Sequence, residues 1–285
     1  MTDARSLRRW ATERLSRAQV PSAARDADEL LAHVLGVPLG RLLLVDEVVE
    51  EARSRYEALV ERRAAREPLQ HLTGLAGFRR VELAVGPGVF VPRPETELLA
   101  GWAIEQAEQV RRAAGRPAVV VDLCTGSGAV ARAVVDEAPG SRVHAVELDP
   151  AAYDWARRNL EGTEVDLRLG DMASAFDDLR GEVDVVVCNP PYIPLEAWES
   201  VAPEARDHDP HGALFSGADG LDALRVLEGR AAVLLRPGGV VGAEHADAQG
   251  ESAPAVFSRT GRWTLVRDHL DLAGRPRFLT ARLAP

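Results

Sequence analysis

Apolar residues in the first part of the chain recur every three or four positions, as they do on one face of a helix. One such segment begins at Ser22 and ends at Gly36, and these residue types are typical of the two ends of a helix. A second segment with this periodicity extends from Glu47 to Arg66. The pattern predicts a small helical N-terminal domain over residues 1–73.

The periodicity changes between residues 74 and 92, where apolar and polar or small residues alternate, as in a strand exposed on one side. Gly86-Pro87-Gly88 is typical of a turn. We therefore expect residues 74–92 to form a β-hairpin that links two domains. A helix is predicted to follow from Glu95 to Arg112, because acidic residues in its first turn interact favourably with the helix dipole.

The remainder of the chain, residues 93–285, alternates between short apolar runs and segments with helical periodicity. Continuous apolar runs are typical of parallel strands that are buried on both faces. The predicted strands are 118–123, 143–146, 183–188, 240–243, 264–268 and 276–282, and the predicted helices between them are 127–137, 151–160 and 221–235. This order predicts an α/β fold with a doubly wound, mostly parallel sheet and helices on both of its faces.

A glycine-containing turn, Asp122-Leu123-Cys124-Thr125-Gly126-Ser127-Gly128, joins the first of these strands to a helix. Glycine lets the backbone approach a ligand closely, because no Cβ stands in the way. The turn alone is equally compatible with close packing, and its glycine spacing differs from the G-x-G-x-x-G pattern of dinucleotide sites. Asp122 could face a positively charged ligand group or simply cap the loop.

Two acidic residues at the ends of later strands sharpen this interpretation. Glu147 ends the second strand, where a carboxylate can accept hydrogen bonds from the two hydroxyls of a ribose. Asp171 could bind the exocyclic amine of an adenine, and Met172 could cover the ring. Together with the turn, these residues predict an adenosine-containing cofactor. S-adenosylmethionine fits better than NAD, because it has no pyrophosphate to bind.

Asn189-Pro190-Pro191-Tyr192 follows a buried strand, at the sheet edge where open α/β sheets bind ligands. Two prolines remove two backbone donors and restrict the backbone. The Asn189 side-chain oxygen and the Pro190 carbonyl can each accept one N–H hydrogen bond from a planar NH2 group, and Tyr192 can stack on that group. The loop therefore predicts methylation of an sp2 nitrogen, with these four residues as the catalytic residues.

Charge and composition restrict the partners. The formal net charge is −10, which argues against nucleic acid as the main partner. No apolar run is long enough for a membrane span, and no signal peptide is recognisable, so we expect a cytoplasmic protein. His208 and His211 lack a third ligand at a suitable spacing, so no metal site is predicted.

With these residues in view, the sequence resembles the release factor glutamine methyltransferases, the PrmC or HemK family. The resemblance covers nearly the whole chain. It includes the segments 67–74, 90–97 (Phe-Val-Pro-Arg-Pro-Glu-Thr-Glu), 122–128, Glu147, 189–193, 209–210 and 217–221. The chain departs from the family at Cys124, where glycine is usual, and at Met172, where an aromatic residue is frequent.

The resemblance implies a Rossmann-like class I methyltransferase fold and S-adenosylmethionine as cofactor. It implies cofactor contacts at Thr125, Gly126, Ser127, Gly128, Glu147, Met172 and Asn189, in addition to the candidates Asp122, Cys124 and Asp171. The implied substrate is the glutamine of the Gly-Gly-Gln motif in class I peptide chain release factors, and the N-terminal domain would help to dock that protein. We expect a monomer with no direct contact to nucleic acid or membrane.

Other functions remain open from the sequence. A glutamine of a ribosomal protein and an exocyclic amine of a nucleic-acid base also present a planar NH2 group to such a loop. A noncatalytic cofactor-binding module is a further alternative, although an intact Asn-Pro-Pro-Tyr loop argues against it.

Overall fold

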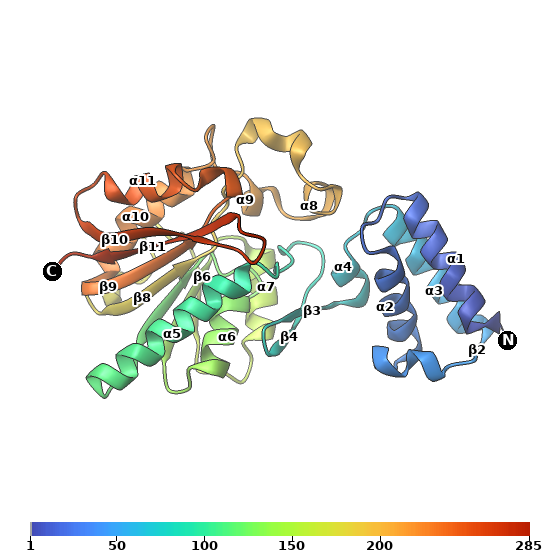
Figure 1. The fold of residues 1–285 in the computed structure, drawn as a ribbon. Coiled ribbons are helices and arrows are strands. Elements are labelled where there is room, and N and C mark those ends of the chain that lie inside the picture. Colours follow the sequence, from blue (N-terminus) through green and yellow to red (C-terminus); the bar gives the residue numbers. More distant parts are fainter. Residues whose placement is uncertain (1) are drawn as a thin grey trace. The chain divides into compact units, whose positions relative to one another are not determined.

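The computed structural model describes residues 2–285 (Figure 1). The chain forms two compact units. One contains the residues up to 75 together with 202–208, and we call it the helical unit. The other contains residues 76–201 and 209–285, and we call it the sheet unit. The first boundary lies near the predicted end of the N-terminal domain at residue 73, whereas the sequence did not predict that 202–208 belongs with the helices.

The helical unit is built from α1 (Ala4–Arg17), α2 (Ala23–Leu35), α3 (Glu50–Ala64), α4 (Leu69–Thr73), α8 (Pro203–His208) and the 3-10 helix η1 (Leu39–Leu44). The predicted helix from Ser22 to Gly36 is confirmed as α2, and Gly36 ends it with a φ of 64°. Helix α3 starts later than predicted, because β2 (Glu47–Val48) pairs with β1 (Thr2–Asp3). Tyr56 is fully buried in the core and donates to the Ala27 carbonyl.

Ion pairs attach α8 to the other helices of this unit. Arg63 is buried and pairs with Asp26 at 2.8 Å and with Glu204 at 3.0 Å. Arg66 pairs with Glu204 at 2.7 Å. These arginines lower the pKa of Glu204 to about 2, against the effect of burial. The attachment of residues 202–208 thus depends on pairs between residues far apart in the sequence.

The linking hairpin consists of β3 (Leu75–Phe78) and β4 (Val81–Ala84). Its turn lies at Arg79 and Arg80. The sequence predicted the hairpin turn at Gly86-Pro87-Gly88, and this prediction was wrong. Arg79 takes a φ of 52° there, and its guanidinium pairs with Glu137 at 2.6 Å. Gly86–Gly88 forms a separate turn against the Trp155 ring, which lies where a Cβ of Gly86 would stand.

The sheet unit contains a seven-stranded sheet in the order β10-β11-β9-β8-β5-β6-β7. The strands are β5 (Val119–Leu123), β6 (Arg142–Glu147), β7 (Asp166–Leu169), β8 (Val183–Cys188), β9 (Leu235–Glu244), β10 (Trp263–Leu270) and β11 (Pro276–Leu283). Pairing is parallel from β7 to β9, and β11 runs antiparallel to both of its neighbours. The predicted mostly parallel sheet is confirmed.

Helices cover both faces of this sheet (Figure 1). The core on one face packs α5 (Thr96–Ala114), α6 (Ala129–Glu137) and α7 (Pro150–Asn159), and it contains Val120 and Val185. The core on the other face packs α10 (Asp222–Leu234) and α11 (Ser252–Ser258), and it contains Val121 and Val186. Successive strand residues therefore face opposite helix layers, which explains the continuous apolar runs and confirms the doubly wound architecture.

Strand β9 is longer than predicted. Pro237-Gly238-Gly239 was expected as a turn before the strand, but it lies within β9. Val183 pairs with Leu235 and Val185 with Val240, so five residue steps on β9 oppose two on β8. The segment is a bulge, and Gly238 has a φ of 79° in it.

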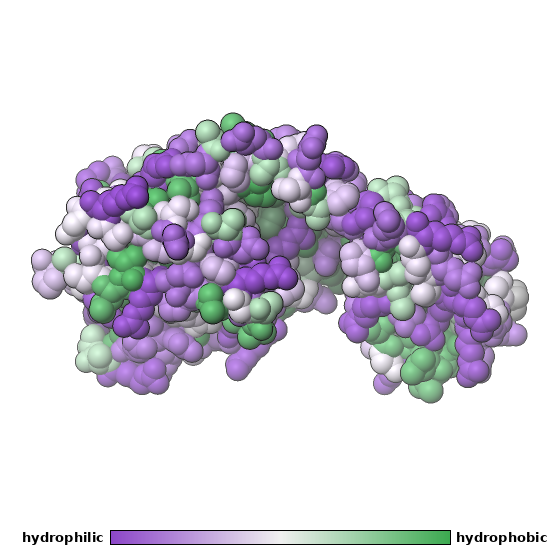
Figure 2. Space-filling model, turned by 45° about the horizontal axis from the view of Figure 1, so that its top comes forward, coloured by the Kyte–Doolittle hydropathy of each residue, from purple (hydrophilic) through white to green (hydrophobic). Residues whose placement is uncertain are grey.

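Shorter elements complete the sheet unit: η2 (Asp177–Leu179), η3 (Leu195–Ser200), α9 (His211–Leu214) and η4 (Asp247–Gln249). The surface mixes hydrophilic and hydrophobic side chains on the visible side (Figure 2). Within residues 2–285, none of the helices has the length and apolar character needed to cross a membrane.

The strand order determines where a ligand site can form. From β5 the chain first adds β6 and β7 on one side and then β8 and β9 on the other. Ligands of doubly wound sheets bind at the carboxyl edge where this order reverses. Here that point lies between β5 and β8, where Leu123 and Cys188 are paired. The residues that follow each of them, 124–128 and 189–192, are the predicted cofactor turn and the predicted catalytic loop.

Candidate active site

The turn after β5 is open to a ligand at Gly126. Gly126 has a φ of 58°, and a Cβ built on it would meet no atom within 4 Å. Gly128 has a φ of 82°, and its Cβ would come within 3.2 Å of Leu160, so this glycine allows α6 to pack on α7. Cys124 adopts a φ of 65°, a conformation that favours glycine. Glycine at position 124 would adopt this backbone conformation without strain.

Asp122 holds this turn together. Its side chain is 1% exposed and accepts hydrogen bonds from the Thr125 hydroxyl at 2.6 Å and from the Ala131 backbone at 3.2 Å. Burial raises the pKa of Asp122 to about 7, although both hydrogen bonds oppose this shift. These contacts correspond to the loop-capping interpretation of the sequence, and a contact of Asp122 with a cofactor stays a prediction.

Glu147, at the end of β6, is tied to the same turn. Its Oε2 accepts from the Gly126 backbone at 2.7 Å, and its Oε1 accepts from Leu148 and Asp149, both at 2.9 Å. Burial raises its pKa, and these backbone donors oppose the shift. Oε1 already accepts two hydrogen bonds, whereas Oε2 accepts one and can accept another, so a ribose hydroxyl is a chemically suitable partner for Oε2.

The next loops contribute an apolar surface beside Glu147. Leu148 is 66% exposed at the end of β6, and Met172 is half-buried with its Sδ 3.5 Å from Cys124 Sγ. Asp171 is exposed and accepts from the Ala173 backbone at 2.8 Å. Leu148 was missed from the sequence, although an apolar residue directly after a strand-end acid is a recognisable signal. An exposed leucine at this edge is suited to cover a planar ring.

The Asn189–Tyr192 loop is anchored from two directions. Asn189 Nδ2 lies 3.3 Å from the Thr96 hydroxyl at the start of α5. The Tyr192 hydroxyl donates to Glu244 Oε1 at 3.1 Å, at the end of β9. Burial and the Glu244 carboxylate both raise the pKa of Tyr192. Glu244 was missed from the sequence, although its place at the carboxyl end of a strand next to β8 was a usable signal.

The backbone of this loop is also supported from behind. Gln249 Nε2 donates to the Tyr192 carbonyl at 3.0 Å and to the Asp219 carbonyl at 3.3 Å. Gly220 has a φ of 76°, and a Cβ built on it would stand 2.3 Å from the Tyr192 carbonyl. Only glycine at position 220 therefore allows the segment 217–221 to lie against the loop.

Two segments that carry the family resemblance meet in the structure. Arg93 pairs with Asp209 at 2.6 Å and lies 4.8 Å above the Phe90 ring. Burial raises the pKa of Asp209 to about 6, against the effect of Arg93. An ion pair thus joins the segment 90–97 to the segment 209–210.

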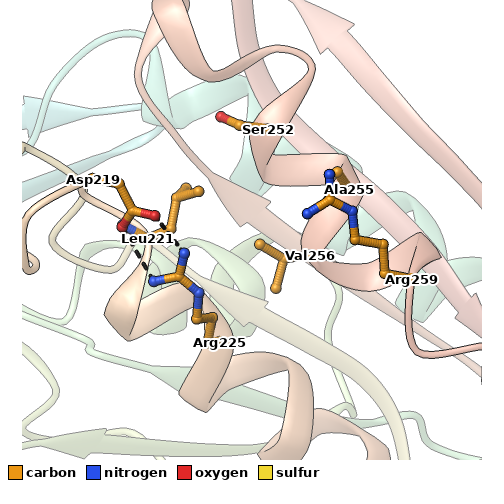
Figure 3. A pocket seen from close by; sticks show the side chains of 7 residues that line it. All are labelled: Asp219, Leu221, Arg225, Ser252, Ala255, Val256 and Arg259. Carbon is orange, nitrogen blue, oxygen red and sulfur yellow. Dashed lines mark hydrogen bonds and ion pairs between the residues drawn. The ribbon is translucent and has the colours of Figure 1, made fainter.

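A separate cavity of about 370 Å³ lies between the start of α10 and α11 (Figure 3). It is lined by Asp219, Leu221, Arg225, Ser252, Ala255, Val256 and Arg259. None of the predicted cofactor or catalytic residues lines it. Arg225 pairs with Asp219 and Asp222, so its charge is already balanced.

The chain matches two family models: the PrmC N-terminal domain over residues 6–74 and a methyltransferase domain over residues 120–209. A solved methyltransferase from Pyrococcus furiosus has the same fold, with a TM-score of 0.50, 18% identity and coverage of 81% of this chain and 100% of that one. Sheet order, loop placement and these matches define a methyltransferase with the class I, Rossmann-like fold.

Curated relatives narrow the family. The chain is 59% identical to a release factor glutamine methyltransferase from Streptomyces coelicolor, over 96% of each chain. It is 42% identical to a 4-amino-L-phenylalanine/4-methylamino-L-phenylalanine methyltransferase from Streptomyces pristinaespiralis, over 89% of this chain and 87% of that one. The chain belongs to the release factor glutamine methyltransferase family, and the resemblance inferred from its motifs is confirmed.

Proposed function

We propose that this protein transfers a methyl group from S-adenosylmethionine to the side-chain amide nitrogen of the glutamine in the Gly-Gly-Gln motif of class I release factors. The observation that carries the proposal is the placement of the Asn189–Tyr192 loop beside the turn at 124–128. The strands that end in these loops are directly paired. A nitrogen held by the first loop therefore lies next to a ligand held by the second.

The residues present fit the cofactor. Gly126 leaves open space at the turn, Glu147 Oε2 can accept a further hydrogen bond from a ribose hydroxyl, and Leu148 and Met172 offer apolar surface for adenine. Cys124, Thr125, Ser127 and Gly128 would complete the contact at the turn, Asp171 would accept from the adenine amine, and Asn189 would border the methyl group. The cofactor supplies a methyl group on a positively charged sulfur.

The chemistry of the loop fits an amide substrate. The lone pair of an amide nitrogen is delocalised, so the nitrogen is a poor nucleophile and must be held in line with the methyl group. The Asn189 side-chain oxygen and the Pro190 carbonyl can accept its two N–H groups, and Tyr192 can lie against the amide plane. Positive charge that develops on the nitrogen is stabilised by both carbonyl dipoles.

Two findings favour a release factor as the substrate. The relative with 59% identity carries this activity in its name, and the helical unit matches the PrmC N-terminal domain model.

The relative at 42% identity is named for an amine on an aromatic ring, so this scaffold also accommodates another nitrogen in a planar system. We propose that the helical unit docks the release factor and that the protein acts as a monomer in the cytoplasm.

The test is methyl transfer from labelled S-adenosylmethionine to a purified class I release factor. The same factor with its Gly-Gly-Gln glutamine replaced by asparagine serves as control, and 4-amino-L-phenylalanine, a ribosomal-protein mixture and RNA serve as competing substrates. We expect label only on the intact factor. Equal labelling of the replaced factor, or faster labelling of a competing substrate, would contradict the glutamine assignment.

A second measurement tests the loop. Asn189→Ala should lower kcat by about a hundredfold, the order of effect expected when one preorganised hydrogen-bonding partner is lost. Cofactor affinity, measured by titration calorimetry, should change only a few-fold. If kcat stays near the wild-type value, the loop mechanism is wrong.

A further inference from the structure

We infer that Thr96 and Glu244 form a hydrogen-bond relay that orients the Asn189 side-chain amide, so that its oxygen faces the substrate nitrogen. The inference rests on the proposed function, because it explains how the catalytic loop is held ready for a planar NH2 group. Both residues act through Asn189 and Tyr192, so they are positioning residues.

The relay starts at a carboxylate that is enclosed in the sheet unit. Glu244 ends β9 and is 1% exposed. Its Oε1 accepts from the Tyr192 hydroxyl at 3.1 Å, whereas its buried Oε2 accepts no hydrogen bond from any residue that the structure describes. The Thr96 hydroxyl interacts with the same carboxylate and lowers its pKa. The threonine hydroxyl is therefore a neighbouring donor for the second oxygen, beside the buried Arg277 Nε.

Counting protons along the relay determines the direction of each hydrogen bond. When Glu244 is ionised, its carboxylate can only accept, so the single Thr96 hydrogen points towards Glu244. The Thr96 oxygen can then only accept from Asn189. The group that faces Thr96 at 3.3 Å must accordingly be the Asn189 NH2, as the structure has it. Because the two ends of an amide point in different directions, the Asn189 oxygen is turned away from Thr96.

This orientation matters for the reaction. With the amide reversed, the Asn189 NH2 would face the substrate NH2, so two donors would meet and one acceptor for the nitrogen would be lost. An isolated asparagine prefers neither orientation, so the relay supplies the preference. Burial raises the pKa of Glu244 to about 7, and the positive charge of Arg277 opposes this shift and favours the ionised form that the relay needs.

The decisive variant is Thr96→Val, which keeps the shape of the side chain and removes its hydroxyl. We expect kcat for the release factor to fall at least thirtyfold, while KM and cofactor affinity stay within about threefold. Thr96→Ser restores the hydroxyl and should recover most of kcat. Thr264→Val is the matched control, because Thr264 lies exposed on β10 and contacts the Arg282 carbonyl; its kcat should equal that of the wild type.

Glu244→Gln tests the other end of the relay. Its amide can donate to Thr96 and so reverse the hydrogen bonds, and kcat should fall at least tenfold. Thr96→Val combined with Glu244→Gln should be no slower than the slower single variant, because both changes break one relay. Multiplied effects would show two separate roles and overturn the inference, as would wild-type kcat in Thr96→Val.

The outcomes separate this inference from the proposed function. A wild-type protein that does not methylate the release factor refutes the function, whatever the variants do. An active wild type with an active Thr96→Val refutes the relay alone. If Thr96→Val unfolds at a lower urea concentration than Thr96→Ser, kcat is compared below both transitions, and recovery of kcat only in the serine variant still supports the relay.

Discussion

Gly220→Ala tests whether the segment behind the catalytic loop holds it in place. Gly220 has a φ of 76°, and a Cβ there would stand 2.3 Å from the Tyr192 carbonyl and 2.7 Å from Gln249 Nε2. Gly162 is a matched control with the same φ of 76° and no atom within 4 Å of its Cβ position. The two alanine variants therefore share the backbone strain and differ in the overlap.

The structure allows the difference to be worked out. Alanine at a positive φ costs about 1 kcal/mol, and this cost applies to both variants. At position 220 the neighbouring loop must also retreat, so the hydrogen bonds of Gln249 to Tyr192 and Asp219 are disrupted. Each contributes about 1 kcal/mol. We expect a loss of unfolding free energy of about 3 kcal/mol for Gly220→Ala and about 1 kcal/mol for Gly162→Ala.

Urea unfolding followed by circular dichroism measures these losses, and methyl transfer measures the effect on the loop. Displacing a reacting group by an ångström can cost about a hundredfold in rate, so kcat of Gly220→Ala should fall ten- to a hundredfold. Gly162→Ala should keep wild-type kcat. Equal stability and equal kcat in the two variants would refute the idea that Gly220 is required by its contact with Tyr192.

Three further predictions concern strain and charge. Cys124→Gly should raise the free energy of unfolding by about 1 kcal/mol in urea titrations, because Cys124 has a φ of 65°; an unchanged midpoint would contradict this. The pKa of Glu204 is lowered to about 2, so its pairs stabilise the protein above pH 4.5 and are lost as the pH falls towards 2. Glu204→Gln should therefore cost about 1 kcal/mol at pH 7, after allowance for solvent screening, and nothing at pH 2. Burial raises the pKa of Glu244 to about 7, and the relay needs the ionised carboxylate. The kcat should therefore rise with pH through about 7. A flat pH profile of kcat from pH 5.5 to 8.5 would contradict the role of Glu244 in the relay. The other titratable or charged groups that act on Glu244 are Tyr192, Arg277 and Glu95.

Local patterns were sufficient to predict most strands of the seven-stranded sheet and the longer helices beside them. The strand at 183–188 has the predicted bounds, because a run with five apolar residues in six can be buried on both faces only within a covered sheet, and Asp184 pairs with Arg116 and Arg236. The helix that ends at Gly36 was predicted from its end residues, since glycine readily takes the left-handed conformation there. The bulge at 237–239 was missed, because Pro-Gly-Gly is equally typical of a turn, and only pairing with β8 determines which one forms.

The residues of the candidate site also fall into two groups, those recognisable from the sequence and those that only the structure brings together. Asn189-Pro190-Pro191-Tyr192 and the turn at 122–128 were recognisable because each is a contiguous motif at the end of a strand. Thr96 and Glu244 lie on α5 and β9, far from the loop in the sequence, so their hydrogen bonds with Asn189 and Tyr192 become visible only in the structure.

By itself, then, the sequence determined the fold class, the family and the two loops of the candidate site, because these depend on periodicity and on contiguous motifs. Only the tertiary structure decided that Gly220 and Gln249 support the Tyr192 carbonyl and that residues 202–208 join the helices through Glu204. These features depend on hydrogen bonds and ion pairs between residues that only folding brings together. The separation of these residues along the chain does not predict their distance in space.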